Sequence, residues 1–531
     1  MRPILLIALA AAGLAQTVVP TAQYDNQRTG ANWHEALLTP RNVHPATFGK
    51  LFVLPVDGDT YAQPLFVPRL EIPGKGVHNV VFVATEHDSV YAFDAAGRPD
   101  TPLWHVSFLR GKGVTTVPQA AVGCQFIEPE IGITSTPVID AASRTMYVLV
   151  RTSEPGSDAR PRYYQRLHAL DIADGAERPG SPVLIRASVR VPGLFGLWQS
   201  EVSFHALREN PRAGMLLTNG NVYMAWGSSC DVGPYYGWVL AYDSRTLQQT
   251  GVFNASPSAG ESGIWQADTG IAADEHGDVY AVTGNGTFNG ASGGRDYGDS
   301  VLKMGFANGA LAVRDYFTPS NQSELNAHDA DLGSGGPVLL PDQPGPHPHL
   351  LVTAGKGGVL YVIDRDRMGQ FHAGSDSHAI QTIPAPGPRT AAFGAPAYWN
   401  GHLYYSGSNA PLKDFAVNQG RLSTVPIHQG GVVIQEPGAI PSISANGTKD
   451  GIVWVLRTKG WEQGNTYGVL QAYDAHDVSQ LLYTTDAGGR DSPGMVLRFT
   501  VPTVADGRVY VGMRHALFVY GLRDSPRPKP R

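Results

Sequence analysis

The chain has 531 residues, too many for one ordinary hydrophobic core, so the sequence predicts either several domains or one repeat architecture. Hydrophobic residues make up 42% of the chain and charged residues 16%, with 62 Gly and 40 Pro; this composition excludes a disordered chain and favours many short strands over long helices. The net charge of −6 argues against a nucleic-acid-binding surface, which would be basic.

The first segment of the chain has the features of a secretory signal. Arg2 gives a positive start, residues 4–14 are apolar or Gly, and small residues stand before Gln16, a plausible cleavage point. The apolar run is shorter than the ~20 residues that a membrane span needs. We therefore expect a signal peptide at 1–15, a periplasmic or secreted mature protein, and no membrane span in it. An uncleaved anchor is the alternative.

One pattern recurs along the rest of the chain. A short apolar strand leads through a turn to a strand of the Val/Leu-Tyr-Val type, and a third strand ends in Ala-Tyr-Asp or a similar sequence. Alternation with period two, flanked by Gly and Asp, predicts antiparallel strands joined by turns. About eight copies follow one another, and they start near residues 63, 135, 216, 278, 336, 395, 440 and 501.

A repeat of ~40–60 residues is typical of propeller blades. Each small sheet cannot bury both of its faces alone, whereas a closed ring covers them and leaves short edges. We therefore predict an all-β fold, a β-propeller of eight four-stranded blades over residues 16–524, with seven blades as the alternative. Residues 50–54 are expected to add a strand to the last blade and close the ring, and 525–531 to form a disordered tail. The rival fold is a β-sandwich array, whose repeats would be about 100 residues long.

The sequence contains two cysteines, Cys124 and Cys230. In an oxidising compartment two cysteines can pair. Because their separation in space does not follow from the sequence, a disulfide and two free thiols both stay open. No Cys-x-x-Cys-His segment occurs, which excludes a c-type haem site.

Two segments near the N-terminus are Tyr24-Asp25-Asn26-Gln27-Arg28-Thr29-Gly30 and Leu37-Leu38-Thr39-Pro40-Arg41-Asn42-Val43. Together they resemble the start of the dehydrogenases that use pyrroloquinoline quinone (PQQ). The resemblance runs over nearly the whole mature length. It implies a quinoprotein propeller with PQQ and Ca²⁺ or a lanthanide as cofactors, a small-molecule alcohol or sugar as substrate, and a soluble electron acceptor. Likeness of fold does not give activity, so the site has to be argued residue by residue.

The resemblance implies two metal ligands and a catalytic base. The Thr-Gly-Asn stretch that ends at Asn285 is similar to the family segment whose Asn oxygen coordinates the metal, and an amide oxygen suits a hard cation. Asp231 stands where the family has a metal-ligand Glu. Asp331, in the acidic segment 328–332, stands where the family has its catalytic aspartate, with Asp329 as the alternative. A Gly-Asn-Gly turn and a solvated acidic loop are the structural alternatives.

Three further positions are implied to contact the quinone. Lys356 matches a family cation at the quinone oxygens, and Trp265 stands near the position of a stacking Trp. Cys124 lies in the loop where the family has two adjacent cysteines joined over the quinone. The Arg that follows in the family is replaced by Glu128-Pro129-Glu130, which would repel an anionic cofactor. A Lys at a strand turn and a structural Trp are the structural alternatives.

The sequence leaves three functions open. The first is a quinoprotein that oxidises an alcohol or sugar. The second is a non-catalytic propeller that serves as a scaffold or ligand-binding protein of the cell envelope. The third is a hydrolase or lyase that uses Glu128, Glu130 and Glu201 at the mouth of the ring. His347 and His349 offer two imidazoles for a metal, but without an evident third ligand they are more typical of a polar loop.

Overall fold

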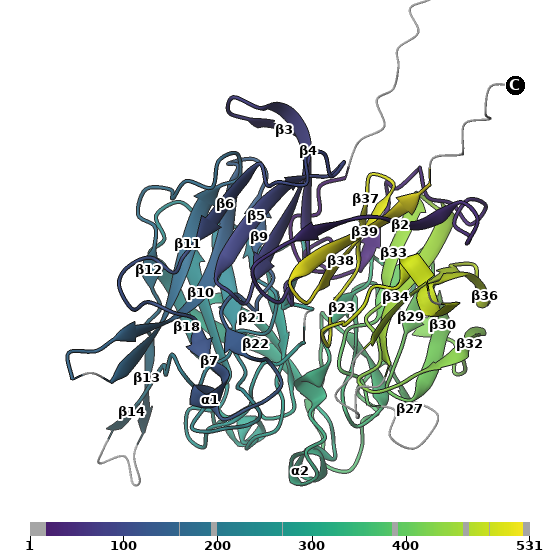
Figure 1. Cartoon of the computed structure of the whole chain (residues 1–531). Helices are drawn as coiled ribbons and strands as arrows, with labels where there is room; N and C mark the ends of the chain where they lie inside the picture. Colours follow the sequence, from purple (N-terminus) through teal and green to yellow (C-terminus); the bar gives the residue numbers. More distant parts are fainter. Residues whose placement is uncertain are drawn as a thin grey trace, which may run out of the picture.

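Eight small, mainly antiparallel sheets are arranged around a ring and form an eight-bladed β-propeller, as the repeat pattern predicts (Figure 1). This computed structural model describes residues 17–158, 160–192, 199–267, 269–384, 391–459, 467–487 and 489–523. The signal peptide expected at 1–15 and the tail expected at 525–531 lie outside these residues.

Each blade starts with its innermost strand, because the first strands of most successive blades contact one another. The first four blades are β3 (Leu65–Ile72), β4 (Gly76–Thr85), β5 (Ser89–Asp94) and β6 (Trp104–Ser107); β9 (Val138–Asp140), β10 (Thr145–Pro155), β11 (Pro161–Asp171) and β12 (Val183–Leu184); β15 (Leu216–Thr218), β16 (Asn221–Ala225), β17 (Trp238–Asp243) and β18 (Gln249–Asn254); and β19 (Ala272–Ala273), β20 (Val279–Val282), β21 (Val301–Ala307) and β22 (Ala310–Thr318), extended by β26 (Gln370–Phe371).

The other four blades repeat this order. They are β23 (Val338–Leu339), β24 (Leu350–Ala354), β25 (Val359–Asp364) and β27 (Gln381–Pro384); β28 (Ala397–Trp399), β29 (His402–Tyr405), β30 (Ala410–Asn418) and β32 (His428–Ile434), with β31 (Arg421–Leu422); β33 (Ser442–Asn446), β34 (Lys449–Lys459), β35 (Tyr467–Asp474) and β36 (Asp477–Thr484), with β1 (Ala31–Asn32); and β37 (Thr503–Ala505), β38 (Arg508–Met513), β39 (Ala516–Leu522) and β2 (Phe48–Pro55). Two hairpins, β7 (Val117–Pro118) with β8 (Glu130–Ile131) and β13 (Ser188–Pro192) with β14 (Gln199–Ser203), and the short helices α1 (Gln119–Val122) and α2 (Gln322–Ala327) lie outside the blades.

The ring is closed by a strand from the other end of the chain. β2 pairs antiparallel with β39, with Phe48 opposite Leu522 and Pro55 opposite Ala516. Figure 1 shows this purple strand beside the yellow strands of the last blade. The closing strand predicted at residues 50–54 is therefore confirmed. Because the closure joins the two ends of the chain, no blade carries a long unpaired edge at this seam.

Apolar layers between neighbouring blades hold the ring together. A separate cluster of buried side chains lies between each pair of successive blades, including the pair formed by the last and the first. Between the seventh and eighth blades, Phe48 contacts Trp454 and Tyr483, with ring centroids 5.4 and 4.9 Å apart. Such aromatic contacts stabilise beyond the area that they bury. Because side chains alternate along each strand, one face of a blade packs against the preceding blade and the other face packs against the following blade.

A segment that precedes the first blade, residues 19–32, lies across the inner edges of the blades. We call it the central segment. It hydrogen-bonds to a residue in or next to the first strand of every blade, through backbone or side-chain atoms. The partners are Phe66, Ile139, Met215, Ala273, Leu339, Tyr398, Ile443 and Val504, in blade order. Part of this segment is the Tyr-Asp-Asn-Gln-Arg-Thr-Gly sequence noted above, which therefore has a structural role in this chain.

Arg28 is the most deeply held residue of the central segment. Its side chain is fully buried and donates to the carbonyl oxygens of Ile271 (2.9 Å), Met215 (3.0 Å) and Ala22 (2.7 Å). Burial lowers the pKa of Arg28 to about 10, against the opposing effect of Asp25, so the side chain stays charged at neutral pH. One buried cation therefore ties the central segment to the third and fourth blades.

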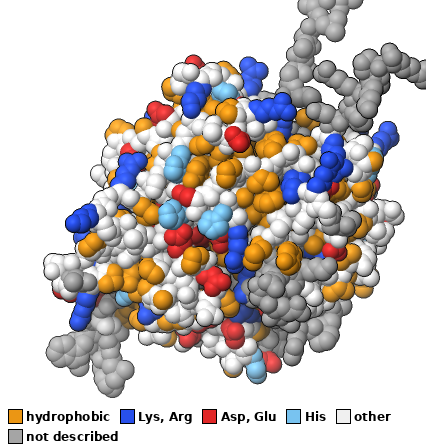
Figure 2. All heavy atoms as spheres, viewed as in Figure 1, with side chains coloured by type: hydrophobic (Ala, Val, Ile, Leu, Met, Phe, Trp, Pro, Cys, Tyr) orange, Lys and Arg blue, Asp and Glu red, His pale blue; other side chains and the backbone are white. Residues whose placement is uncertain are grey.

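The surface carries charges of both signs. In the face shown in Figure 2, Lys and Arg side chains alternate with Asp, Glu and His, without a large area of one sign. Among the described residues, no helix is both long enough and apolar enough to cross a membrane.

We expect Arg28→Met to lower the free energy of unfolding by about 3–5 kcal/mol, because it leaves buried carbonyl oxygens of two blades without a donor. Urea unfolding followed by tryptophan fluorescence measures the change. Arg41→Met, at an exposed position, is the matched control and should change stability by less than about 0.5 kcal/mol. Equal effects of the two substitutions would contradict the role given to the central segment.

Candidate functional site

A cavity of about 470 Å³ opens at one end of the ring. Its walls come from the loops between blades and from the turns between the second and third strands of blades, all of which reach the same end. α1 and α2, which belong to two such loops, mark this end at the bottom of Figure 1. The central segment hydrogen-bonds to the first strands of the blades, and these strands directly follow the loops that form the cavity. The cavity therefore lies on one side of the central segment.

Four of the six residues predicted to form the site line this cavity. They are Asp231, Trp265, Asp331 and Lys356. Asp231 stands in the turn between β16 and β17 and Lys356 in the turn between β24 and β25, while the other two lie in the loops that lead into the fourth and fifth blades. The ring brings them together although they span 125 positions of the sequence.

Lys356 forms an ionic contact with two aspartates. Its Nζ lies 2.5 Å from Asp331 Oδ2 and 2.9 Å from Asp329 Oδ1. Asp331 is almost fully buried, with 3% of its surface exposed. Burial alone would lower the pKa of Lys356, but the charges of Asp331 and Asp329 outweigh it and raise that pKa. The lysine therefore stays protonated and keeps its positive charge beside the two aspartates.

Asn285 approaches the same aspartates from the turn between β20 and β21. Its backbone N–H donates to Asp331 Oδ1 (2.8 Å) and its Nδ2 donates to Asp329 Oδ1 (2.7 Å). Its Oδ1 is buried and has no hydrogen-bond partner in the described residues. A buried acceptor without a partner costs free energy. An amide oxygen beside carboxylates is, however, a ligand that a hard cation such as Ca²⁺ prefers.

Asp231 adds a third carboxylate to this group. It accepts a hydrogen bond from the Tyr235 hydroxyl (2.8 Å), and its backbone φ of 55° is of a kind that Asp tolerates better than most residues. Burial raises the pKa of Asp231, and the charges of Asp331 and Asp329 raise it further. The three carboxylates repel one another, and a bound cation would offset this repulsion.

Trp265 forms a flat wall of the cavity. A Cβ built at Gly227 would lie 3.1 Å from its indole, and one at Gly284 would lie 2.9 Å from it, so glycine backbone packs closely against the ring. Tyr235 packs edge-on, with ring centroids 6.0 Å apart. The Trp265 Nε1 is buried without a partner in the described residues. An aromatic face held in this way suits stacking on a planar ligand.

The two cysteines form a disulfide between Cys124 and Cys230, with Cα atoms 5.5 Å apart. This settles the pairing that the sequence left open. Cys230 lines the cavity, next to Asp231 in the chain. Cys124, which the resemblance pointed to, is almost fully buried among apolar side chains that include Ile127 and Ile131. The resemblance therefore pointed to the more buried cysteine of the pair, whereas Cys230 is the one that lines the cavity.

Two arginines in the cavity were missed by the sequence analysis. Arg212 lies with its guanidinium carbon 5.0 Å from the centre of the Phe499 ring, and Arg498 lies 4.3 Å from that of Phe126. Burial lowers the pKa of Arg498 to about 9. These two arginines supply positive charge to the cavity, whereas the Glu128–Glu130 segment is acidic. Both stand in irregular loops between blades, where no strand period or motif marks them.

The carboxylates of the hydrolase hypothesis do not gather at one site. Glu128 Oε1 lies 3.9 Å from Arg514, and Glu130 is held by the Nδ1 of His87 (2.9 Å). Glu201 lies on β14 and lines a separate cavity of about 600 Å³. Glu201 therefore does not share a site with the other two glutamates.

Comparison with known proteins supports the fold. No protein family and no curated protein matches the sequence. The structure is similar to the quinohemoprotein alcohol dehydrogenase ADHIIG from Pseudomonas putida HK5, with a TM-score of 0.61, 14% identity and coverage of 97% of this chain and 82% of that one. It is also similar to a europium-containing methanol dehydrogenase, with a TM-score of 0.60, 13% identity and coverage of 95% and 98%. At these identities the likeness shows the fold alone.

Asp299 supports the loop that carries Asp331. Its Oδ1 accepts from the backbone N–H of Leu332 (3.0 Å), one residue after the catalytic candidate. Burial raises the pKa of Asp299 from 3.8 to about 7, and the charge of Asp331 adds to the shift. Ionisation of Asp299 in the folded protein is therefore unfavourable.

Because the pKa of Asp299 is higher in the folded than in the unfolded chain, its stabilising contribution is complete at low pH and is lost as pH rises from about 4 to 7. Asp299→Asn keeps the acceptor for Leu332 and cannot ionise. We expect the free energy of unfolding of the variant to increase relative to that of the parent as the pH rises over this range. Urea unfolding at a series of pH values measures this difference. Asp100→Asn, at an exposed position, is the matched control, against which the pH dependence of the Asp299→Asn difference is compared. The same pH dependence for the two variants would contradict the shift.

Proposed function

We propose that the protein is a quinoprotein that binds PQQ with Ca²⁺ or a lanthanide in this cavity and oxidises an alcohol or sugar. The observation that carries the proposal is the buried, unpartnered Oδ1 of Asn285, placed beside Asp331. An amide oxygen free to ligate, three nearby carboxylates and an aromatic wall together match what a metal-bound planar cofactor requires. Export to the periplasm or beyond the cell is part of the proposal.

The cavity suits the quinone in size and charge. Small-molecule sites have volumes of roughly 300–1,000 Å³, and this one has about 470 Å³. In the proposal, Trp265 would provide the stacking surface for the planar cofactor, and Lys356, Arg212 and Arg498 would balance its negative charge. PQQ supplies the two-electron acceptor when it is bound. Because the sequence has no c-type haem site, the electrons leave to a separate soluble acceptor.

The chain's own residues provide the metal ligands and the base. In the proposal, Asn285 Oδ1 and the Asp231 carboxylate hold the cation, and Asp331 accepts the proton of the substrate hydroxyl at Oδ2. Lys356 contacts that same oxygen and would hold the carboxylate in position for this transfer. The nearly complete burial of Asp331 limits competition from water for this position.

Equilibrium dialysis of the purified, untagged protein against PQQ with Ca²⁺ or La³⁺ tests the proposal. We expect one PQQ retained per chain with one of the two metals, together with a rise in melting temperature, because the ligand binds the folded state. Asn285→Ala should weaken the metal-dependent retention at least tenfold. Asn326→Ala, at an exposed position of α2, is the matched control and should leave it unchanged.

A second variant separates binding from chemistry. Asp331→Asn should retain PQQ but lose at least about a hundredfold in turnover on a panel of alcohols and sugars with an artificial electron acceptor. Failure to retain PQQ with either metal would contradict the proposal and favour a non-catalytic propeller of the cell envelope. Retention of PQQ with unchanged turnover in Asp331→Asn would contradict the role of the base.

A further inference from the structure

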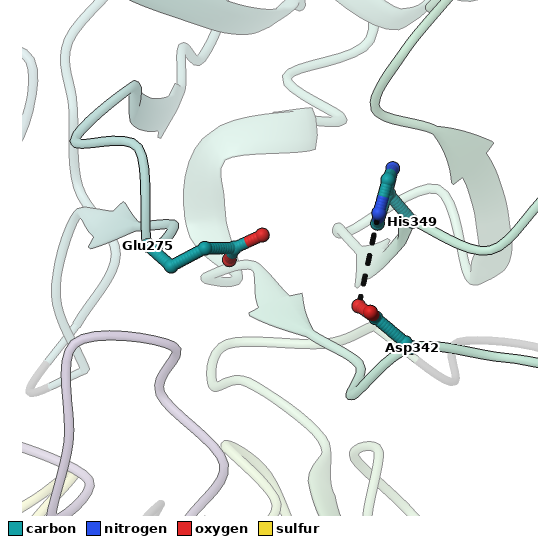
Figure 3. A group of neighbouring side chains, drawn as sticks. All are labelled: Glu275, Asp342 and His349. Carbon is teal, nitrogen blue, oxygen red and sulfur yellow. Dashed lines mark ion pairs between the residues drawn. The ribbon is translucent and has the colours of Figure 1, made fainter.

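A second group of metal-ligating side chains lies at the other end of the ring. Figure 3 shows Glu275 facing Asp342 and His349. Glu275 stands in the turn between β19 and β20, and the other two stand in the loop between β23 and β24. In these antiparallel blades, turns between first and second strands lie opposite those that form the cavity. The group therefore lies at the opposite end of the ring from the proposed quinone site, and the two sites are built from different loops and turns.

The three side chains are close enough to share one ion. One ligand atom from each lies within 4.8 Å of the others, and His349 Nε2 is 3.8 Å from Asp342 Oδ1. Ligands of a tetrahedral Zn²⁺, at bond lengths of about 2.0–2.1 Å, are about 3.4 Å apart. Asp342 is 75% exposed and Glu275 53% exposed, so small side-chain rotations can close the remaining distance.

The imidazole of His349 is oriented by a carboxylate that contacts its Nδ1, the nitrogen that faces away from Glu275 and Asp342. His349 Nδ1 contacts Asp366 Oδ2 at 2.7 Å, so in the neutral imidazole this nitrogen carries the proton and Nε2 presents a lone pair to the carboxylates. A carboxylate on the far nitrogen is the usual outer-shell support of a metal-binding histidine. His347, the other imidazole of this loop, contacts Asp364 (2.6 Å) and is not part of the group.

The charges of the group also call for a cation. Among the described residues, neither Glu275 nor Asp342 forms an ion pair with a lysine or arginine; the ionic contact of Glu275 is with His276, at 3.5 Å. Two carboxylates from different blades therefore meet beside an imidazole acceptor without a basic side chain to balance them. A divalent ion would balance this charge and join the fourth blade to the fifth.

We propose that Glu275, Asp342 and His349 bind one Zn²⁺ ion, with water as the fourth ligand. The donor set selects the metal: imidazole is a good ligand for Zn²⁺, whereas Ca²⁺ and Mg²⁺ prefer sites built from oxygen alone. The ion links two blades at the end of the ring opposite the cavity. The inference is independent of the quinone proposal.

Isothermal titration of the untagged, chelator-treated full chain with Zn²⁺ tests the site, and Co²⁺ serves as a spectroscopic probe. We expect one Zn²⁺ per chain and a visible Co²⁺ absorption typical of four-coordinate geometry. His349→Gln should weaken Zn²⁺ binding at least a hundredfold and abolish that absorption, and Asp366→Asn should weaken binding by about 10–100-fold. His347→Gln, in the same loop, is the matched control and should change neither readout.

Two further variants test whether a loss of Zn²⁺ binding comes from misfolding or from the separate site in the cavity. The exposed Asp342→Asn should lose Zn²⁺ affinity while its metal-free melting temperature stays that of the parent, which excludes misfolding as the cause. Asp231→Asn, in the cavity, should keep Zn²⁺ binding, which separates this site from the quinone site. Absence of Zn²⁺ binding, or equal binding by His349→Gln and His347→Gln, would overturn the inference.

Discussion

The hydrogen bonds between the central segment and the inner strand of every blade are the constraint on which the rest of the structure depends. Several inner strands are very short: β19 and β23 have two residues each. Strands of this length cannot satisfy their own inner backbone groups, and buried backbone groups need partners. Residues 19–32 provide these partners around the whole ring, and the buried charge of Arg28 fixes their position. The loops leading into these strands are therefore held in a defined arrangement.

The cavity follows from this arrangement. Its chemistry comes from loops and turns of different blades that the ring brings to a common end, so its carboxylates, its lysine and its two arginines share no local sequence motif. Lys356 neutralises one of the three carboxylates that surround it, and Asn285 leaves one oxygen unused. An amide oxygen without a partner beside these carboxylates is the feature of the site that suits a hard cation.

Most of the fold could be predicted because its signal is local. Period-two alternation marks each strand, and repetition of the three-strand pattern marks each blade, so the closing strand at residues 50–54 was also predictable. Asp231, Trp265, Asp331 and Lys356 were found because segments around them resemble a known family. The central segment contributed to that resemblance, but its structural role was not visible in the sequence.

The missed features all depend on contacts between loops far apart in the chain. The disulfide, which the sequence left open, spans 106 positions, and no local pattern relates its two cysteines. Arg212 and Arg498 stand in irregular loops and meet only because the ring is closed. In the same way, the histidine loop lacked a third ligand in the sequence, whereas the structure brings Glu275 to it from the preceding blade. Such contacts are set by ring geometry and not by spacing along the chain.

The most direct test of the central claim is to locate a metal ion in the cavity. A crystal of the protein with PQQ and a lanthanide would show the ion by its anomalous scattering. We expect a peak within about 2.3–2.6 Å of Asn285 Oδ1 and of a carboxylate oxygen of Asp231. Anomalous peaks confined to surface carboxylates, with no metal ion bound to Asn285 Oδ1, would contradict the proposed metal site.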